Sequence, residues 1–262
     1  MSNETERWQN LHAKIAHVYE TFARYKLAGP IKSEMSDAII VADGINLGER
    51  KAEELKTYQW KAMTTLGTVE DYKHFLPRLL ELNCLQRRER VLGGEAAACE
   101  IVERAIDLST IVDKLHYGKV LDCPASELEA LYEFGVARWR WALILPADYG
   151  HDLQETMMLI AVIGRPLQVL LESSLESRDM DELCGLARFI NRCVEFSVKA
   201  GGTHVRWTES YLNAPDQFEK WILQPHVEAA LEQAFFQFGQ GEAAAELSSA
   251  VQKIGWLREM QP

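Results

Sequence analysis

The sequence predicts an all-α protein, an irregular multi-helix bundle or a stack of helix pairs with about eight to ten helices and no sheet of consequence. Apolar residues recur at spacings of three and four along most of the chain, which is the pattern of amphipathic helices. Glycine and proline residues separate these periodic segments, and strand-like alternation of useful length is missing. We find no convincing fixed-period repeat, so a regular repeat array is not expected.

The first fifty residues are expected to form one helix and one long loop. Asn3 and Glu6 match a capping box at the helix start, and Gly29–Pro30 ends the helix because proline cannot continue it. The short apolar run Ile39–Val41 has no strand to pair with elsewhere in the sequence, so we interpret 31–50 as a loop packed against helices. The apolar stripe of the first helix is Trp8, Leu11, Ile15, Val18 and Phe22.

The stretch Tyr58–Leu82 combines a helix end and a helix start. Helical periodicity runs from Ala52 to Leu66, and Gly67 is a suitable C-terminal cap. Thr68 and Asp71 then match the capping pair of a new helix. Pro77 lies on the apolar face of that helix, so either the helix kinks there or another helix begins with Pro77 in its first turn.

The remaining helices are delimited by Gly and Pro in the same way. The segment from 152 to 175 is apolar nearly all round, which is typical of a helix at the centre of a bundle. The helix after this segment starts at a cap formed by Asp179 and Glu182 and is expected to reach Val198. Further helical segments are expected at 95–116, 126–143, 205–212, 217–223, 226–238 and 242–257.

Composition sets the broad class. The 262 residues carry a net charge of −11, which repels phosphate backbones and anionic lipid surfaces, so nucleic acid and membrane are not expected partners. The polar, acidic first residues and the short apolar runs predict a cytoplasmic protein without a transmembrane helix. We expect a single domain over 1–262, with a soft boundary near 93–94.

The sequence carries no recognisable catalytic, cofactor or metal motif. Its five cysteines are widely spaced, without a C-x-x-C pair or zinc-type histidine spacing, and are expected to be reduced thiols. Asp71 and His74 are three residues apart on one helical face, where they could tune the imidazole for proton transfer, ligate a metal or form a surface ion pair. Trp139 and Arg140 belong to residue types enriched at binding hot spots, although core packing is the favoured explanation of the tryptophan.

The run K-A-M-T-T-L-G-T-V-E-D-Y-K-H-F-L-P-R-L-L-E-L within Tyr58–Leu82 resembles a motif of a family of uncharacterised all-helical bacterial proteins. The end of the first helix, F-A-R-Y at Phe22–Tyr25, resembles the same family. The resemblance covers about the first third of the chain and implies an all-helical fold. Family members carry a cysteine cluster after the first helix, whereas Lys32–Asp43 has no cysteine here, so this chain departs from the family at any metal site there.

Two functions are open at this point. The first is a non-enzymatic acidic binding protein, most concretely an immunity-type protein that neutralises a basic bacterial toxin domain, with Asp71, His74, Trp139 and Arg140 as candidate partner-binding residues. The alternative is a hydrolase or transferase that uses an Asp/His constellation around Asp71 and His74.

Overall fold

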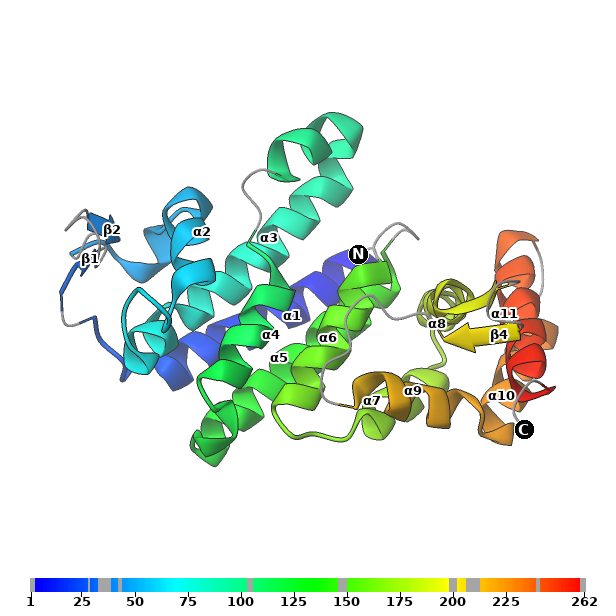
Figure 1. The fold of residues 1–262 in the computed structure, drawn as a ribbon. Coiled ribbons are helices and arrows are strands. Elements are labelled where there is room, and N and C mark those ends of the chain that lie inside the picture. The colour runs from blue at the N-terminus through cyan, green and yellow to red at the C-terminus, as the bar shows by residue number, and fades with distance from the viewer. Residues whose placement is uncertain are drawn as a thin grey trace. The chain divides into compact units, whose positions relative to one another are not determined.

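The computed structural model describes residues 3–27, 29–32, 39–41, 44–102, 106–145, 150–197, 202–205, 213–238 and 241–259. These residues form eleven α-helices, two single turns of 3-10 helix and two short two-stranded ribbons (Figure 1). The predicted all-α class is confirmed, with one helix more than the upper end of the expected range. None of the described helices is long and apolar enough to cross a lipid bilayer.

The helices are α1 (Asn3–Phe22), α2 (Ala52–Lys61), α3 (Val69–Val102), α4 (Leu108–Tyr117), α5 (Ala125–Leu143), α6 (Gly150–Val162), α7 (Leu167–Leu175), α8 (Met180–Cys193), α9 (Ala214–Ile222), α10 (Pro225–Phe238) and α11 (Gly241–Glu259). The single 3-10 turns are η1 (Leu47–Glu49) and η2 (Val120–Asp122). The strands are β1 (Ile31–Lys32), β2 (Ile39–Val41), β3 (Val194–Ser197) and β4 (Gly202–Val205).

Helix α3 is longer than local sequence rules predict. It starts at the expected place, where Thr68 and Asp71 form a capping box, but α2 ends at Lys61 rather than near Leu66. Met63 and Gly67 both have positive φ in the intervening turn, which ends α2 early. The helix then runs through Pro77 and through the predicted boundary at Gly93–Gly94. Buried side chains on both sides of Pro77 outweigh the one backbone hydrogen bond that the proline removes.

The interpretation of Ile39–Val41 as an unpaired loop segment is wrong. It forms β2, which pairs antiparallel with β1, with Ile31 opposite Val41. Both of these side chains are buried, so the ribbon gains the apolar contact that an isolated strand lacks.

The prediction that the helix starting at Asp179 reaches Val198 is wrong. Helix α8 starts at its predicted cap, Asp179, but ends at Cys193, and Val194–Ser197 continues as β3. β3 pairs antiparallel with β4 in a register that sets Val194 opposite Val205. The β-branched and aromatic residues of V-E-F favour a strand, and pairing within the chain decides the competition. Most of the helix expected at 205–212 lies outside the described residues.

The chain divides into two compact units. The N-terminal unit is Trp8–Phe134, and the C-terminal unit combines Met1–Arg7 with Gly135–Pro262. The predicted stripe of α1 is buried at every expected position, and its last residue, Phe22, lines a small cavity together with Leu76 of α3, Leu115 of α4 and Leu131 of α5. In the C-terminal unit α6 is buried from Asp152 to Ile160, as its all-round apolar pattern predicts, and α8 is buried on most sides as well.

Candidate functional site

Asp71 is used to start helix α3. Its Oδ2 accepts hydrogen bonds from the backbone N of Thr68 at 2.8 Å and from Thr68 Oγ1 at 3.0 Å. In return, the backbone N of Asp71 donates to Thr68 Oγ1 at 3.2 Å. This reciprocal pattern is a capping box, which satisfies backbone donors that would otherwise lack partners at the first turn. The carboxylate therefore has a structural task at this position.

His74 faces a different partner. Its Nδ1 lies 3.0 Å from the backbone O of Tyr25, and a carbonyl oxygen can only accept, so Nδ1 carries the proton. The imidazole also packs edge-on against Phe75. Among the described contacts there is no hydrogen bond or ion pair between Asp71 and His74. The two residues share a helix face, as the spacing predicts, but they do not form a pair.

A buried carboxylate lies beside this stretch. Glu127, in the first turn of α5, is 0% exposed and accepts hydrogen bonds from Tyr25 Oη at 2.7 Å and from Lys73 Nζ at 3.2 Å. Arg24 also forms an ion pair with it. Lys73 Nζ donates in addition to Tyr25 Oη at 3.0 Å. We call Arg24, Tyr25, Lys73, Cys123 and Glu127 the Glu127 cluster.

The electrostatics of the Glu127 cluster keep its ion pair charged. Burial alone would raise the pKa of Glu127, but hydrogen bonds from Tyr25 and Lys73 outweigh burial and hold that pKa below its ordinary value. Burial would likewise lower the pKa of Lys73, yet its hydrogen bonds to Tyr25 and Cys123 raise it overall. Burial raises the pKa of Cys123, so its thiol stays protonated at neutral pH. A carboxylate already occupied by these donors is a poor general base.

The cavity next to the Glu127 cluster is too small for a substrate. Lys73 and Cys123 line it together with apolar side chains such as Phe22 and Leu76, and its volume is about 10 Å³. That is room for roughly one water molecule. The Glu127 cluster therefore fastens the end of α1 to the starts of α3 and α5. In doing so it joins Tyr25, just after α1, to Lys73 in α3.

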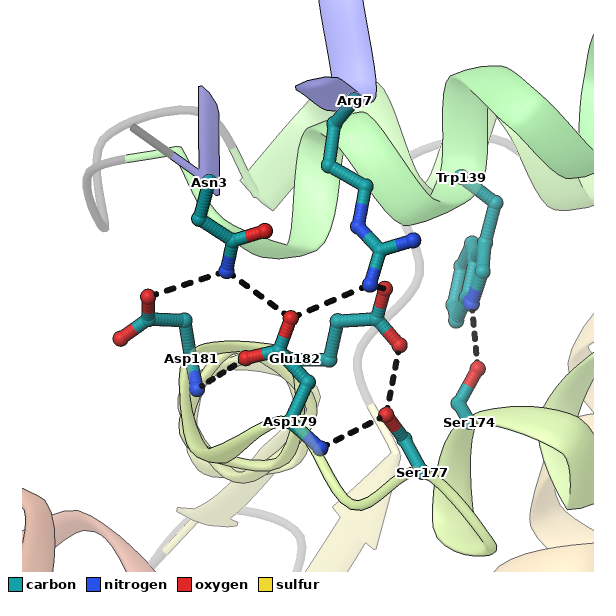
Figure 2. Close-up of polar contacts among 8 residues, drawn as sticks. All are labelled: Asn3, Arg7, Trp139, Ser174, Ser177, Asp179, Asp181 and Glu182. Carbon is teal, nitrogen blue, oxygen red and sulfur yellow. Dashed lines mark hydrogen bonds and ion pairs between the residues drawn. The ribbon is translucent and has the colours of Figure 1, made fainter. Parts of the chain in front are cut away.

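Trp139 and Arg140 differ in how deeply they are buried. Trp139 is 0% exposed, and its Nε1 donates to Ser174 Oγ at 2.7 Å (Figure 2). Its ring packs edge-on against Phe189. An indole in this position belongs to the core of the C-terminal unit. Arg140, the next residue, is half-buried. Of the four candidate partner-binding residues, Trp139 is thus enclosed, and Asp71 and His74 have the internal contacts described above.

The outer sides of α10 and α11 carry acidic and aromatic residues that periodicity does not single out. Phe236 is 77% exposed and lies four residues after the exposed Glu232, so both share one side of α10. On α11, Trp256 is 42% exposed and precedes the exposed Glu259 by three residues. With Glu242 at the start of α11, these residues form what we call the α10–α11 acidic face. Sequence reasoning missed it because the apolar stripe marks only core-facing positions.

The carboxylates of the α10–α11 acidic face are unneutralised. The lysine and arginine on these helices are occupied, because Lys253 donates to the backbone O of Asn191 and Arg258 pairs with Glu228. By contrast, the contacts of the described residues include no hydrogen bond or ion pair for the side chains of Glu232, Glu242 and Glu259. Unpaired carboxylates beside exposed aromatic rings are available to a cationic surface.

Within the part of the chain that the structure describes, no group of three or more His, Cys, Asp or Glu side chains is placed to bind a metal ion. Comparison of the chain with protein-family models, with curated proteins and with solved structures finds no match. The case for a function therefore depends on the geometry and charge of the sites themselves.

Proposed function

We propose that this chain is a non-enzymatic binding protein whose α10–α11 acidic face docks a basic protein partner. Its most concrete version is an immunity-type protein that neutralises a bacterial toxin domain by direct binding. The observation that carries the proposal is the set of unneutralised carboxylates next to Phe236 and Trp256 on two helices that pack together.

The charge distribution supports a basic partner. The C-terminal unit has 12 basic and 19 acidic residues, a net charge of −7, whereas the N-terminal unit carries −4. An acidic surface attracts a cationic protein over roughly the Debye length, about 8 Å at physiological salt, and raises the rate of encounter. Nucleic acid and anionic lipid are repelled by the same field.

The exposed aromatic residues supply apolar contact area, which charge alone does not provide. Exposed carboxylates contribute mainly to the association rate and to partner choice, whereas buried contact area determines how long a complex lasts. Phe236 and Trp256 are aromatic side chains of the kind enriched at protein interfaces. Their exposure leaves apolar surface that a partner would remove from water.

The test uses the product of the neighbouring open reading frame, because a toxin and its immunity protein are normally encoded side by side. Both proteins are purified, and binding is measured by calorimetry at low and high salt. We expect direct binding that weakens as salt rises, and rescue of growth when this chain is co-expressed with a toxic neighbour. No binding at low salt between two folded proteins would overturn the proposal.

Matched charge reversals locate the interface. The double variant Glu232→Lys/Glu259→Lys should weaken binding, since it places like charges against the partner. The control Glu20→Lys/Glu49→Lys changes the net charge equally, at exposed positions in the N-terminal unit, and should leave most of the affinity intact. Equal losses in both double variants would show that net charge acts alone and would exclude the α10–α11 acidic face as the interface.

A further inference from the structure

A groove in the C-terminal unit has the size of a small-molecule site. It lies between the turn that joins α7 to α8 and the last turns of α10, and its volume is about 410 Å³. Sites for small organic ligands commonly occupy roughly 300–1,000 Å³. Ala230 and Ala234, four residues apart on α10, leave the groove open, while Leu175 and Leu183 provide apolar surface within it. The groove therefore offers a small apolar contact beside a larger polar surface.

The polar lining of this groove is Ser177, Arg178, Gln233 and Gln237, and of these only Ser177 has an internal acceptor among the described contacts. Arg178 projects from the turn between α7 and α8, and Gln233 and Gln237 line the side formed by α10. In the described part of the chain, none of these three side chains makes a hydrogen bond or an ion pair. No aspartate or glutamate lines the groove. One cation and two amides are thus directed at a space that holds no anion of the chain itself.

The turn that carries Arg178 is fixed by its neighbours (Figure 2). Ser177 Oγ accepts from the backbone N of Asp179 at 3.2 Å and donates to Glu182 Oε2 at 2.8 Å. Arg7 bridges the two acidic residues, at 3.1 Å from the Asp179 carboxylate and 2.6 Å from that of Glu182. Asn3 Nδ2 adds a hydrogen bond to Asp179 at 2.8 Å.

These contacts determine which anions within the chain remain available to Arg178. Of the acidic residues within four positions of Arg178, Asp179 and Glu182 are paired with Arg7, and the described contacts include no ion pair between Arg178 and Glu176 or Asp181. Burial alone would raise the pKa of Asp179, but the hydrogen bonds from Asn3 and Arg7 hold it below its ordinary value, so this acid stays ionised in that pairing. The turn is therefore held in place, while the exposed Arg178 side chain has no ion pair among the described contacts, which favours an external anion.

We propose that this groove binds an amphipathic monocarboxylate, with the carboxylate on Arg178 and the amides, and the apolar body against Leu175, Leu183 and the alanines of α10. The ligand is either a free small carboxylic acid or the C-terminal residue of a peptide. This site differs in charge from the α10–α11 acidic face and does not depend on the proposed protein partner.

The test is calorimetric titration of the full chain with phenylacetate and, as a matched neutral ligand, phenylacetamide. We expect phenylacetate to bind with a dissociation constant in about the millimolar range, as befits so small a ligand, and phenylacetamide to bind about tenfold more weakly or not at all. Arg178→Gln should cost phenylacetate about tenfold in affinity, because it removes a charge-assisted hydrogen bond. Ala230→Leu should weaken binding by placing a larger side chain in the groove.

The control Lys220→Gln removes an exposed cation of the same unit that lies outside the groove and should leave phenylacetate binding unchanged. Circular dichroism verifies that each variant is folded, and Arg178→Gln, at an exposed position, keeps the test valid if Ala230→Leu does not fold. Absence of phenylacetate binding, or equal affinities of the wild type and Arg178→Gln, would overturn the proposal.

A second arm identifies the source of the ligand. Tripeptides that end in phenylalanine are titrated with a free and with an amidated C-terminus. A free-carboxylate peptide that binds tenfold more tightly than phenylacetate supports the site and assigns it to peptide ends. A peptide that binds no better than phenylacetate supports the site and assigns it to small acids.

Discussion

At Gly185 the backbone of α8 lies close to the end of α5, and Gly185→Ala should destabilise the C-terminal unit. A Cβ atom at this position would lie 1.8 Å from the backbone O of Leu143 and 2.6 Å from its backbone C. Leu143 ends α5, so its carbonyl has no acceptor role within the helix, and Arg188 Nη2 donates to it at 3.3 Å. Alanine would force the two backbones apart and weaken this contact.

The magnitude follows from three contributions. Overpacking costs about 1–3 kcal/mol, and the upper end applies because the opposing atoms are backbone and cannot rotate away. Loss of the Arg188 hydrogen bond costs about 1 kcal/mol. Alanine in place of glycine inside a helix returns about 1 kcal/mol. We therefore expect a net loss of about 3 kcal/mol in the free energy of unfolding.

Gly255→Ala in α11 is the matched control. A Cβ there meets only Glu228 Oε1, at 3.9 Å, which is an ordinary contact, so helix propensity alone should stabilise the protein by up to about 1 kcal/mol. Urea unfolding followed by circular dichroism measures both variants against the wild type. The two identical substitutions should shift the midpoint in opposite directions. If Gly185→Ala unfolds at the wild-type midpoint or above it, α8 does not approach Leu143 this closely.

Three further outcomes are expected. The pKa of Glu127 in the folded protein lies below its unfolded value of about 4.3, so its contribution to stability is present above that pH and is lost as pH falls through the folded pKa. Glu127→Gln should therefore flatten the acidic part of a series of urea midpoints measured against pH. A pH series identical to that of the wild type would contradict the described pairing. Asp71→Ala should lower the free energy of unfolding by about 1 kcal/mol through loss of the capping box, measured by urea unfolding, whereas no loss would leave the carboxylate free for the enzymatic alternative. Trp139→Phe should lower the free energy of unfolding by about 1–2 kcal/mol because it removes the hydrogen bond to Ser174. The control Trp256→Phe, on the exposed side of α11, should change the free energy of unfolding by no more than about 0.5 kcal/mol. Equal urea midpoints for the two variants would argue against the burial of Trp139.

Helical periodicity could predict the elements that bury a single continuous stripe. In α1 the five expected positions are the five buried ones, and the caps at Thr68 and Asp179 are where the sequence places them. Both signals are local, because they involve residues at most four apart. They fail where packing between segments decides the outcome, as at Pro77, which α3 passes without ending.

The residues of the candidate sites could not be predicted from the sequence, because they come from segments far apart along the chain. The Glu127 cluster joins Tyr25 and Lys73 to a carboxylate that is 102 and 54 residues away along the chain, and no local motif marks such contacts. The groove depends on Arg178 standing opposite α10, which only the fold provides. The strand pair of Ile31 and Val41 shows the same limit at short range, because its signal is too short to be distinguished from a loop.

Residues Asn3–Arg7 belong to the C-terminal unit although the N-terminal unit separates them from the rest of it, and this has a consequence for synthesis on the ribosome. The N-terminal unit is one continuous stretch and can fold as soon as it emerges. Asn3 and Arg7 must instead wait for Asp179, which is translated 176 and 172 residues later, respectively. At typical elongation rates that interval is roughly 10–35 s. The turn that presents Arg178 is therefore completed by residues that are translated well before it.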